Sequence, residues 1–405
     1  MDGEKQSSPS GARNAILAGF LGWTLDAFDF FILTFVLAPV AKEFGQTIPA
    51  IALTITASLA TRWIGAILFG LFADRYGRRI PLIVNILYFS LIEVLSGLAP
   101  NYRVFFFLRL LYGVGMGGEW GVGASLTMES VPTKWRGLIS GLLQEGYALG
   151  FLLAAAVYRL VYPHWGWRPL FFIGGLPALL TLFVRAKVKE PEAWHRSRTD
   201  WTTYRRAIFR NWRRFAYLVL LLAMMNFISH GTQDMYPTLL QQQHGFSPQR
   251  TSDFTAISMI GALCGGLVFG FISDARGRRR TMVTAVLLGI AVIPLWVFAP
   301  NLPLILLGGF LMQFMVQGAW GVIPAHLNEL SPDQLRGFFP GLAYQFGVLM
   351  ASGSAYFEAR MAHAMSYSRA MGLFAAVVLF TGAVVISFGP EEHRAEFGRQ
   401  DSAQA

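Results

Sequence analysis

A row of polar side chains interrupts the apolar segment at residues 215–240. Its members lie at offsets of 0, 3, 4, 7 and 8 residues from the first, so they share one face of a helix. His230 and Asp234 are one turn apart and can share a proton, since histidine titrates near neutral pH. The alternative is a purely structural polar seam between helices. The row consists of Asn226, Ser229, His230, Gln233 and Asp234.

A second pair of ionisable residues, Asp26 and Asp29, lies in the apolar segment at residues 14–40. Three positions apart, they also share a helix face. Two close carboxylates rarely both stay ionised, so one of them is expected to hold a proton. Proton uptake and pairing with a cation are the functional interpretations. A salt bridge that only fixes helix packing is the alternative.

Arg62 lies near the middle of the apolar segment at residues 50–73 and needs an anion there. A guanidinium is a planar fork that fits a carboxylate by two-point contact. A substrate carboxylate is the functional interpretation. The alternative is a permanent partner such as Asp26, Asp29 or Glu93. Both hold if the substrate displaces a resting partner.

Three further charged residues, Arg109, Glu119 and Glu145, lie in apolar segments. Glu119 either faces a cavity or pairs with an arginine, and the same choice is open for Glu145. Arg109 serves either coupling or packing. The glycine-rich stretch at residues 113–118 superficially resembles a dinucleotide-binding loop. No strand precedes it, so close packing of helices explains it better.

These residues belong to a duplicated chain. Residues 70–79 (GLFADRYGRR) return as residues 270–279 (GFISDARGRR), an offset of 200. Three further stretches repeat at the same offset, so the chain consists of two copies of one half. Two apolar halves around a central site are typical of transporters. The other repeats pair residues 98–101 with 298–301, 118–121 with 318–321, and 129–141 with 329–341.

Composition indicates a membrane protein. Hydrophobic residues make up 54% of the chain and charged residues 14%, against about a quarter in soluble proteins. A membrane-spanning helix needs about 20 apolar residues. We predict an all-α membrane protein with twelve spans in two pseudo-symmetric six-helix bundles. The spans are residues 14–40, 50–73, 80–98, 102–128, 137–161, 167–185, 215–240, 250–273, 281–299, 302–328, 337–362 and 368–388.

The excess of basic residues predicts the orientation. The net charge of +10 comes from arginines and lysines between the spans, which argues for cytoplasmic loops and against nucleic-acid binding. We predict a multi-pass protein of the cytoplasmic (inner) membrane with tails 1–13 and 389–405 inside. Bundles 14–185 and 215–388 flank a basic cytoplasmic connector, 186–214. Its tryptophans indicate a helix on the anionic leaflet, with a solvated linker as the alternative.

The loops after the second and eighth spans are candidate gates. A short arginine-rich loop with one acid at a helix end can clamp neighbouring helix ends in one conformation and release them in another. Anchoring of topology by positive charge explains the arginines but not the acids. The predicted gate residues are Asp74, Arg75, Arg78, Glu129, Arg136, Asp274, Arg278, Glu329 and Arg336.

The loop at residues 74–79 (DRYGRR), with its repeat, resembles the signature loop of the major facilitator superfamily. Residues 23–30 (WTLDAFDF), 117–121 (GGEWG) and 226–238 (NFISHGTQDMYPT) resemble the lactate and monocarboxylate permease branch of its sialate:proton symporter family. The resemblance implies the major facilitator fold and proton-coupled symport. It also implies that the 226–238 stretch carries transport residues.

We therefore predict a secondary transporter that moves a small monocarboxylate, such as lactate or pyruvate, with one proton. The predicted substrate-binding residues are Arg62, Asn226, His230, Gln233 and Tyr236. The predicted proton-coupling residues are Asp26, Asp29, Glu119, Glu145, His230 and Asp234.

Other functions are less well supported by the sequence. No ATP-binding loop, metal-ligand cluster or enzyme constellation is present, and the lone Cys264 excludes an intrachain disulfide. The expected partners are the substrate, the proton and the lipid bilayer, with the protein working as a monomer and without a cofactor. One alternative is symport of another organic acid, such as sialate or an aromatic acid. Another is a non-transporting nutrient sensor, although only 15 residues follow Pro390.

Overall fold

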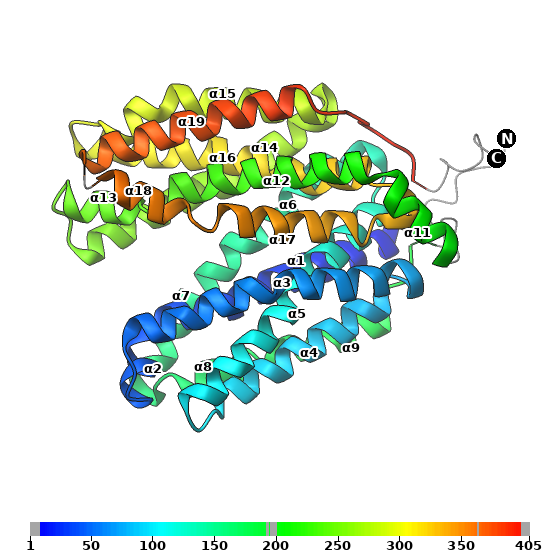
Figure 1. The fold of residues 1–405 in the computed structure, drawn as a ribbon, viewed down its shortest axis with the longest axis horizontal. Helices are drawn as coiled ribbons and strands as arrows, with labels where there is room; N and C mark the ends of the chain where they lie inside the picture. The colour runs from blue at the N-terminus through cyan, green and yellow to red at the C-terminus, as the bar shows by residue number, and fades with distance from the viewer. Residues whose placement is uncertain (1–8, 192–193, 195–200, 363, 398–405) are drawn as a thin grey trace.

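The computed structural model describes residues 9–191, 194, 201–362 and 364–397, and within them the protein is helical (Figure 1). The first half contains α1 (Pro9–Phe35), α2 (Leu37–Glu43), α3 (Ile48–Tyr76), α4 (Arg79–Gly97), α5 (Tyr102–Ser130), α6 (Arg136–Gln144), α7 (Gly146–Trp165), α8 (Arg168–Ile173) and α9 (Leu180–Lys187). The connector contains α11 (Trp201–Arg210). The second half contains α12 (Trp212–Gln233), α13 (Tyr236–Gln242), α14 (Pro248–Arg276), α15 (Arg278–Val297), α16 (Leu302–Leu330), α17 (Phe339–Ala351), α18 (Ser354–Ala362) and α19 (Tyr367–Ser387).

The duplication in the sequence is also a duplication of helix ends. Asn101 caps α5 by accepting a hydrogen bond from the backbone N–H of Val104 at 3.0 Å, and Asn301 caps α16 in the same way. Gly77 and Gly277 end α3 and α14 with φ of 104° and 92°. Only glycine adopts such angles readily, so these two turns depend on it.

Ten helices or helix pairs in the described part of the chain are long and apolar enough to cross a membrane. α5 is not among them, although it is 29 residues long, because its glycines and charged residues lower its mean hydropathy. The pair α17–α18 is not among them either, because each helix is short. Both lie at predicted spans, which completes the expected twelve.

Several predicted spans are broken rather than continuous. The helical hydrogen bonding is interrupted after Gln233, ahead of Pro237, as the missing N–H of the proline predicts, although Asp234 and Met235 keep right-handed helical angles. The segment at 167–185 splits around the 174–177 stretch (GGLP), and the segment at 337–362 splits after Ala351. The first helix begins at Pro9 and ends at Phe35, whose carbonyl would need an N–H from Pro39 to continue the helix.

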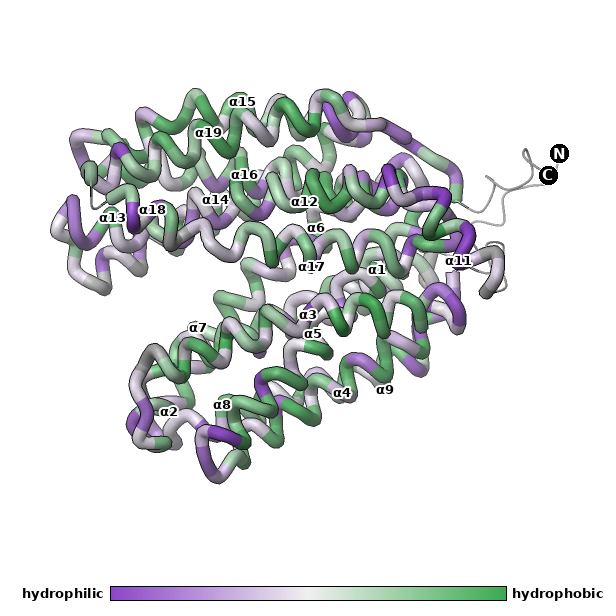
Figure 2. The backbone as a smooth tube through the Cα atoms, in the orientation of Figure 1, coloured by the Kyte–Doolittle hydropathy of each residue, from purple (hydrophilic) through white to green (hydrophobic). Residues whose placement is uncertain are grey.

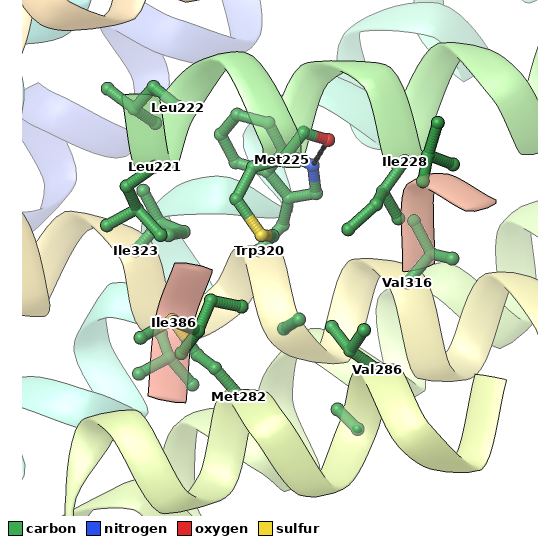
Figure 3. Packing of buried hydrophobic residues seen from close by; sticks show 14 of the residues in the cluster. Leu221, Leu222, Met225, Ile228, Met282, Val286, Val316, Trp320, Ile323 and Ile386 are labelled. Atoms are coloured by element: carbon green, nitrogen blue, oxygen red, sulfur yellow. Dashed lines mark hydrogen bonds between the residues drawn. The ribbon is translucent and has the colours of Figure 1, made fainter. Parts of the chain in front are cut away.

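Each half has an apolar core, and the core of the second half also takes in Trp23, Ala66 and Trp120 of the first half. In the second half, α12, α15, α16 and α19 bring together ten side chains that Figure 3 labels. Among them, the Trp320 indole donates a hydrogen bond to the carbonyl of Met225 at 3.2 Å. The core of the first half is built from α1, α3, α4, α5 and the segments α7 to α9. Large apolar side chains such as Leu91, Phe271 and Phe380 point outward, as a lipid-facing surface requires.

The two halves meet at one end of the molecule. They lie close together near α11 and diverge toward α2 and α13 (Figure 1). Hydrophilic residues gather at these two ends, and apolar stretches run between them (Figure 2). We call the closed end the α11 end.

Candidate functional site

The polar row of α12 divides into two groups. Ser229 accepts a hydrogen bond from Gln317 Nε2 at 3.4 Å, and Gln233 Nε2 donates one to Gln313 Oε1 at 2.7 Å. These contacts join α12 to α16, so this part of the row is a polar seam between helices. Asn226 donates to the carbonyl of Leu222 at 2.8 Å within its own helix.

His230 and Asp234 form the second group. His230 Nδ1 lies 3.1 Å from Asp234 Oδ2, and the two side chains are 38% and 37% exposed. The opposite face of α12 is packed in the core. Asp234 interacts electrostatically with Tyr147 of α7, which places the pair toward the first half. A histidine and a carboxylate in contact and open to water can load and release a proton.

Tyr236 lies apart from this pair. Its side chain is buried, its hydroxyl donates to the carbonyl of Ile305 at 3.3 Å, and its ring packs 5.7 Å from that of Trp296. The Tyr236 side chain therefore packs inside the second half, between α15 and α16.

The acidic residues of α1 are fully buried. None of the four carboxylate oxygens of Asp26 and Asp29 has a hydrogen-bond partner among the described residues. Asp26 interacts electrostatically with Arg62 and Glu93, and Asp29 with Glu93 and Arg109. Ionised carboxylates without donors are costly in such surroundings, so this cluster is suited to hold protons.

Arg109 is paired in this conformation. It forms an ion pair with Glu93 and donates to Ser96 Oγ at 2.7 Å, and its guanidinium lies 4.2 Å from the centre of the Tyr112 ring. Among the partners considered for Arg62, Glu93 is therefore already paired with another arginine.

Arg62 has no ion pair within the described residues. Its Nε and Nη2 atoms are buried and lack hydrogen-bond partners there, and Asp26 and Glu119 are its electrostatic neighbours. Its guanidinium carbon lies 5.9 Å from the centre of the Tyr344 ring. Since Tyr344 belongs to α17, Arg62 lies at the boundary between the halves, with a cationic fork available to an anion.

The glycines of α5 bring α3 close to it. A Cβ at Gly113 would lie 2.0 Å from the carbonyl oxygen of Ser58, and one at Gly117 would lie 1.7 Å from that of Arg62. Helices can approach this closely only through such small residues. Packing of α3 against α5 therefore explains the glycine-rich stretch, as expected.

The two remaining acids of the sequence analysis lie against other helices. Glu119 is buried with both oxygens unpartnered, and a Cβ at Gly22 of α1 would lie 2.4 Å from its Oε1. Glu145 lies between α6 and α7, and its Oε1 would be 1.8 Å from a Cβ at Gly266 of α14. Glu145 therefore contacts the opposite half.

Sequence reasoning missed an aromatic cluster centred on Tyr344, the ring that lies beside Arg62. The Tyr344 ring stacks on Trp120 at 4.7 Å, and it meets Trp23 and Trp320 edge-on at 6.4 Å and 6.0 Å. Trp23 in turn stacks on Tyr147 at 5.8 Å. The repeated tryptophans 120 and 320 were a signal for it, but nothing in the sequence placed them on the same tyrosine.

The predicted gate residues form two clamps at the α11 end. In the first clamp, Asp74 accepts hydrogen bonds from the backbone N–H groups of Gly337 and Phe338 at 2.7 and 3.0 Å. Arg78 pairs with Asp74 and, at 2.8 Å, with Glu129. Asp74 therefore reaches from the first half to the second.

The second clamp repeats the first with the roles of the two halves exchanged. Asp274 accepts from the N–H groups of Gly137 and Leu138 at 2.8 and 3.0 Å. Arg278 pairs with Asp274 and Glu329, both at 2.9 Å. Two longer ion pairs cross between the clamps, Arg136 with Glu329 at 3.8 Å and Arg336 with Glu129 at 3.7 Å. Arg75 lies in the last turn of α3 beside them.

The connector takes part in the first clamp. Trp194 donates to the carbonyl of Asp74 at 2.9 Å, and Tyr204 of α11 donates to its Oδ2 at 3.0 Å. Tyr204 and Ala207 are buried, while Arg205 and Arg206 are exposed. One face of α11 therefore packs on the protein, and burial raises the pKa of Tyr204.

Glu190 binds the backbone of the loop between α3 and α4, beside the first clamp. Its carboxylate accepts from the backbone N–H groups of Arg78 and Arg79, the latter at 3.2 Å. Glu391 accepts from Arg279 at 3.3 Å in the repeat. Burial raises the pKa of Glu190 against the lowering effect of these backbone donors.

Comparison with known proteins shows which families the chain resembles. Residues 19–254 match the family described as Major Facilitator Superfamily, and residues 215–391 match the family described as Sugar (and other) transporter. A carboxylic acid transporter protein homolog of Saccharomyces cerevisiae is 29% identical over 377 residues, which cover 86% of this chain; the chain spans 61% of that relative's length.

A probable 4-methylmuconolactone transporter of Cupriavidus pinatubonensis is 31% identical, with 96% of this chain and 92% of the relative covered. The fold matches the structure of a proton:xylose symporter bound to 6-bromo-6-deoxy-D-glucose, with a TM-score of 0.78, 18% identity and 96% and 98% of the two chains covered. Fold, duplication, clamps and family match agree: the chain belongs to the Major Facilitator Superfamily.

Proposed function

We propose that this chain is a proton-coupled symporter of a small monocarboxylate, such as lactate or pyruvate, in the lactate and monocarboxylate branch of the sialate:proton symporters. It works by alternating access in the cytoplasmic membrane, with the α11 end and both chain ends inside the cell. The carrying observation is Arg62, a buried guanidinium whose Nε and Nη2 atoms have no partner among the described residues.

The position of Arg62 favours a substrate anion over a structural partner. A structural arginine would be paired as Arg109 is with Glu93. Arg62 instead faces Tyr344 of the opposite half, so an anion bound to it would contact both halves. Binding at such a boundary is what couples a ligand to movement of the halves.

The His230–Asp234 pair supplies the proton site of the proposal. Both side chains are partly exposed, so protons reach them from water while the halves are apart. A monocarboxylate and one proton carry no net charge together, so their transport is electroneutral. The buried acids Asp26, Asp29, Glu119 and Glu145 are the further candidates for the coupled proton.

A larger unsaturated or aromatic acid is the second candidate substrate. The ring of Tyr344 lies 5.9 Å from Arg62, and Trp23 and Trp120 pack on it. Such rings stack on planar ligands. The similarity to a probable methylmuconolactone transporter supports the same class. Sialate is a third acid to test, and a non-transporting sensor is the alternative from another class.

Purified protein in proteoliposomes tests the proposal. We expect labelled lactate or pyruvate to accumulate when the vesicle interior is alkaline, and not when only a membrane potential is applied. Benzoate, muconate and sialate are the comparison substrates, and counterflow separates a transporter from a sensor. Binding without exchange of any of these acids would contradict the transport function, and accumulation of sialate alone would reassign the substrate.

A further inference from the structure

A carboxylate outside the predicted site lies buried in the second half. Glu358 belongs to α18, its side chain is 1% exposed, and neither of its oxygens has a hydrogen-bond partner among the described residues. α18 packs against α12 and α19. A purely structural role does not explain a carboxylate in this position, because it makes no hydrogen bond that would offset its desolvation.

Gly231 of α12 lies beside Glu358 and makes room for the ring of Phe374. A Cβ there would lie 3.8 Å from Glu358 Oε1 and 2.5 Å from Cε1 of Phe374 on α19. Gly231 follows His230 directly and lies one turn before Asp234 on the same helix. Asp234 interacts electrostatically with Glu358. The buried acid is therefore a neighbour of the pair that is open to water.

The charges around Glu358 argue that it carries a proton in this conformation. α12 presents Asp234, a like charge, beside His230. α19 contributes one charged residue, Arg369, which is exposed in its first turn, and Arg360 of α18 is also exposed. An ionised Glu358 would face a second carboxylate without a donor, and desolvation of such an ion costs several kcal/mol.

We infer that Glu358 is a proton-binding residue of the transport cycle, which exchanges its proton with Asp234. This inference rests on the proposed symport. The O–H bond of Glu358 breaks as one forms on the Asp234 carboxylate, so charge moves between the acids without leaving the site. Ser352 and Gly353 separate α18 from α17, and α18 packs against α12.

The test compares Glu358→Gln with Asp253→Asn, which neutralises an exposed acid of α14. The substrate is whichever acid of the panel the wild type accumulates. One coupled proton supports about tenfold accumulation for each unit of pH gradient, since one pH unit and a tenfold concentration ratio are equal in free energy. We expect Glu358→Gln to lose this accumulation while counterflow stays near the wild-type rate, and Asp253→Asn to keep both.

Accumulation by Glu358→Gln equal to that of the wild type would overturn the inference. If Glu358→Gln is monodisperse and inserted but loses both counterflow and accumulation, the inference is overturned too, because the loss of both indicates a structural role. Absence of pH-driven accumulation in the wild type would instead count against the proposed symport. If Glu358→Gln does not insert, Glu358→Asp keeps the carboxyl one methylene further from Asp234, and its pH profile must shift; an unchanged profile overturns the inference.

Discussion

Asp74 of the first half accepts a hydrogen bond from the backbone N–H of Gly337 in the second half, at 2.7 Å. The bond requires the two halves to be together at the α11 end. We predict that Asp74→Asn slows turnover, because the amide loses the charge that pairs with Arg78 and weakens the clamp. Substrate affinity should stay within about twofold, a difference below 0.5 kcal/mol.

Turnover and binding are measured separately, by counterflow rate and by equilibrium binding. Asp274→Asn is the matched variant, since Asp274 accepts the equivalent hydrogen bond from the backbone N–H of Gly137 at 2.8 Å. A large loss of affinity with normal turnover in Asp74→Asn would remove this residue from the gate.

Arg62 yields a prediction about affinity. Arg62→Lys keeps the charge but loses the planar fork, so binding of the transported acid should weaken about tenfold or more, since hydrogen bonds to charged groups contribute about 1.5–3 kcal/mol. Arg159→Lys, on the exposed face of α7, is the control. Equilibrium binding to folded protein is the measurement, and unchanged affinity in Arg62→Ala would exclude Arg62 from the site.

The His230–Asp234 contact of 3.1 Å predicts the coupling phenotype. Asp234→Asn should abolish accumulation against a gradient and spare exchange at equal concentrations, because exchange needs no net proton release. His244→Ala changes a histidine outside the pair and should have no effect. Accumulation against a gradient in both Asp234→Asn and His230→Ala would move the proton site to Asp26 and Asp29, and uptake driven by membrane potential would contradict the stoichiometry.

Glu190 predicts a pH dependence of stability. Burial raises the pKa of its carboxyl above the ordinary value of 4.5, so the folded protein binds this proton more tightly than the unfolded chain. Its contribution to stability is therefore complete below pH 4.5 and is lost as pH rises through the raised pKa. Glu190→Gln should flatten this part of the melting-temperature profile above pH 4.5. An unchanged profile would contradict the assignment.

The orientation is tested by labelling single cysteines. In a Cys264→Ser background, which removes the exposed native thiol, Arg206→Cys on α11 should be protected from impermeant reagent in intact cells. Arg103→Cys, at the exposed start of α5, should react. Labelling of Arg206→Cys from outside would reverse the proposed topology.

The sequence predicted the helices better than their interruptions. Hydrophobic length located the spans because it depends on local composition, and the repeat at an offset of 200 gave each span of the first half a counterpart in the second. The break after Gln233 was predictable from Pro237. The break after Ala351 has no proline at that point and was missed. Such a break depends on the packing of α17 and α18 against other helices.

The site shows the same limit. Helical spacing predicted that His230 and Asp234 would meet, since they lie on one helix. It did not predict that Gln233 would bond to Gln313, that Tyr344 would lie beside Arg62, or that Glu358 would approach Gly231. Each of these contacts joins helices that are far apart in the sequence, and one sequence carries no direct signal for them.

The two clamps have the geometry of a two-fold dimer interface. Asp74 contacts Gly337 and Phe338, while Asp274 contacts Gly137 and Leu138, and every number in the second set differs from the first by 200. In an isologous interface, residue i of one subunit contacts residue j of the other and the reverse also holds. The closed end of this single chain is therefore built as two related subunits would build it, and a substitution in one clamp has an equivalent position in the other for comparison.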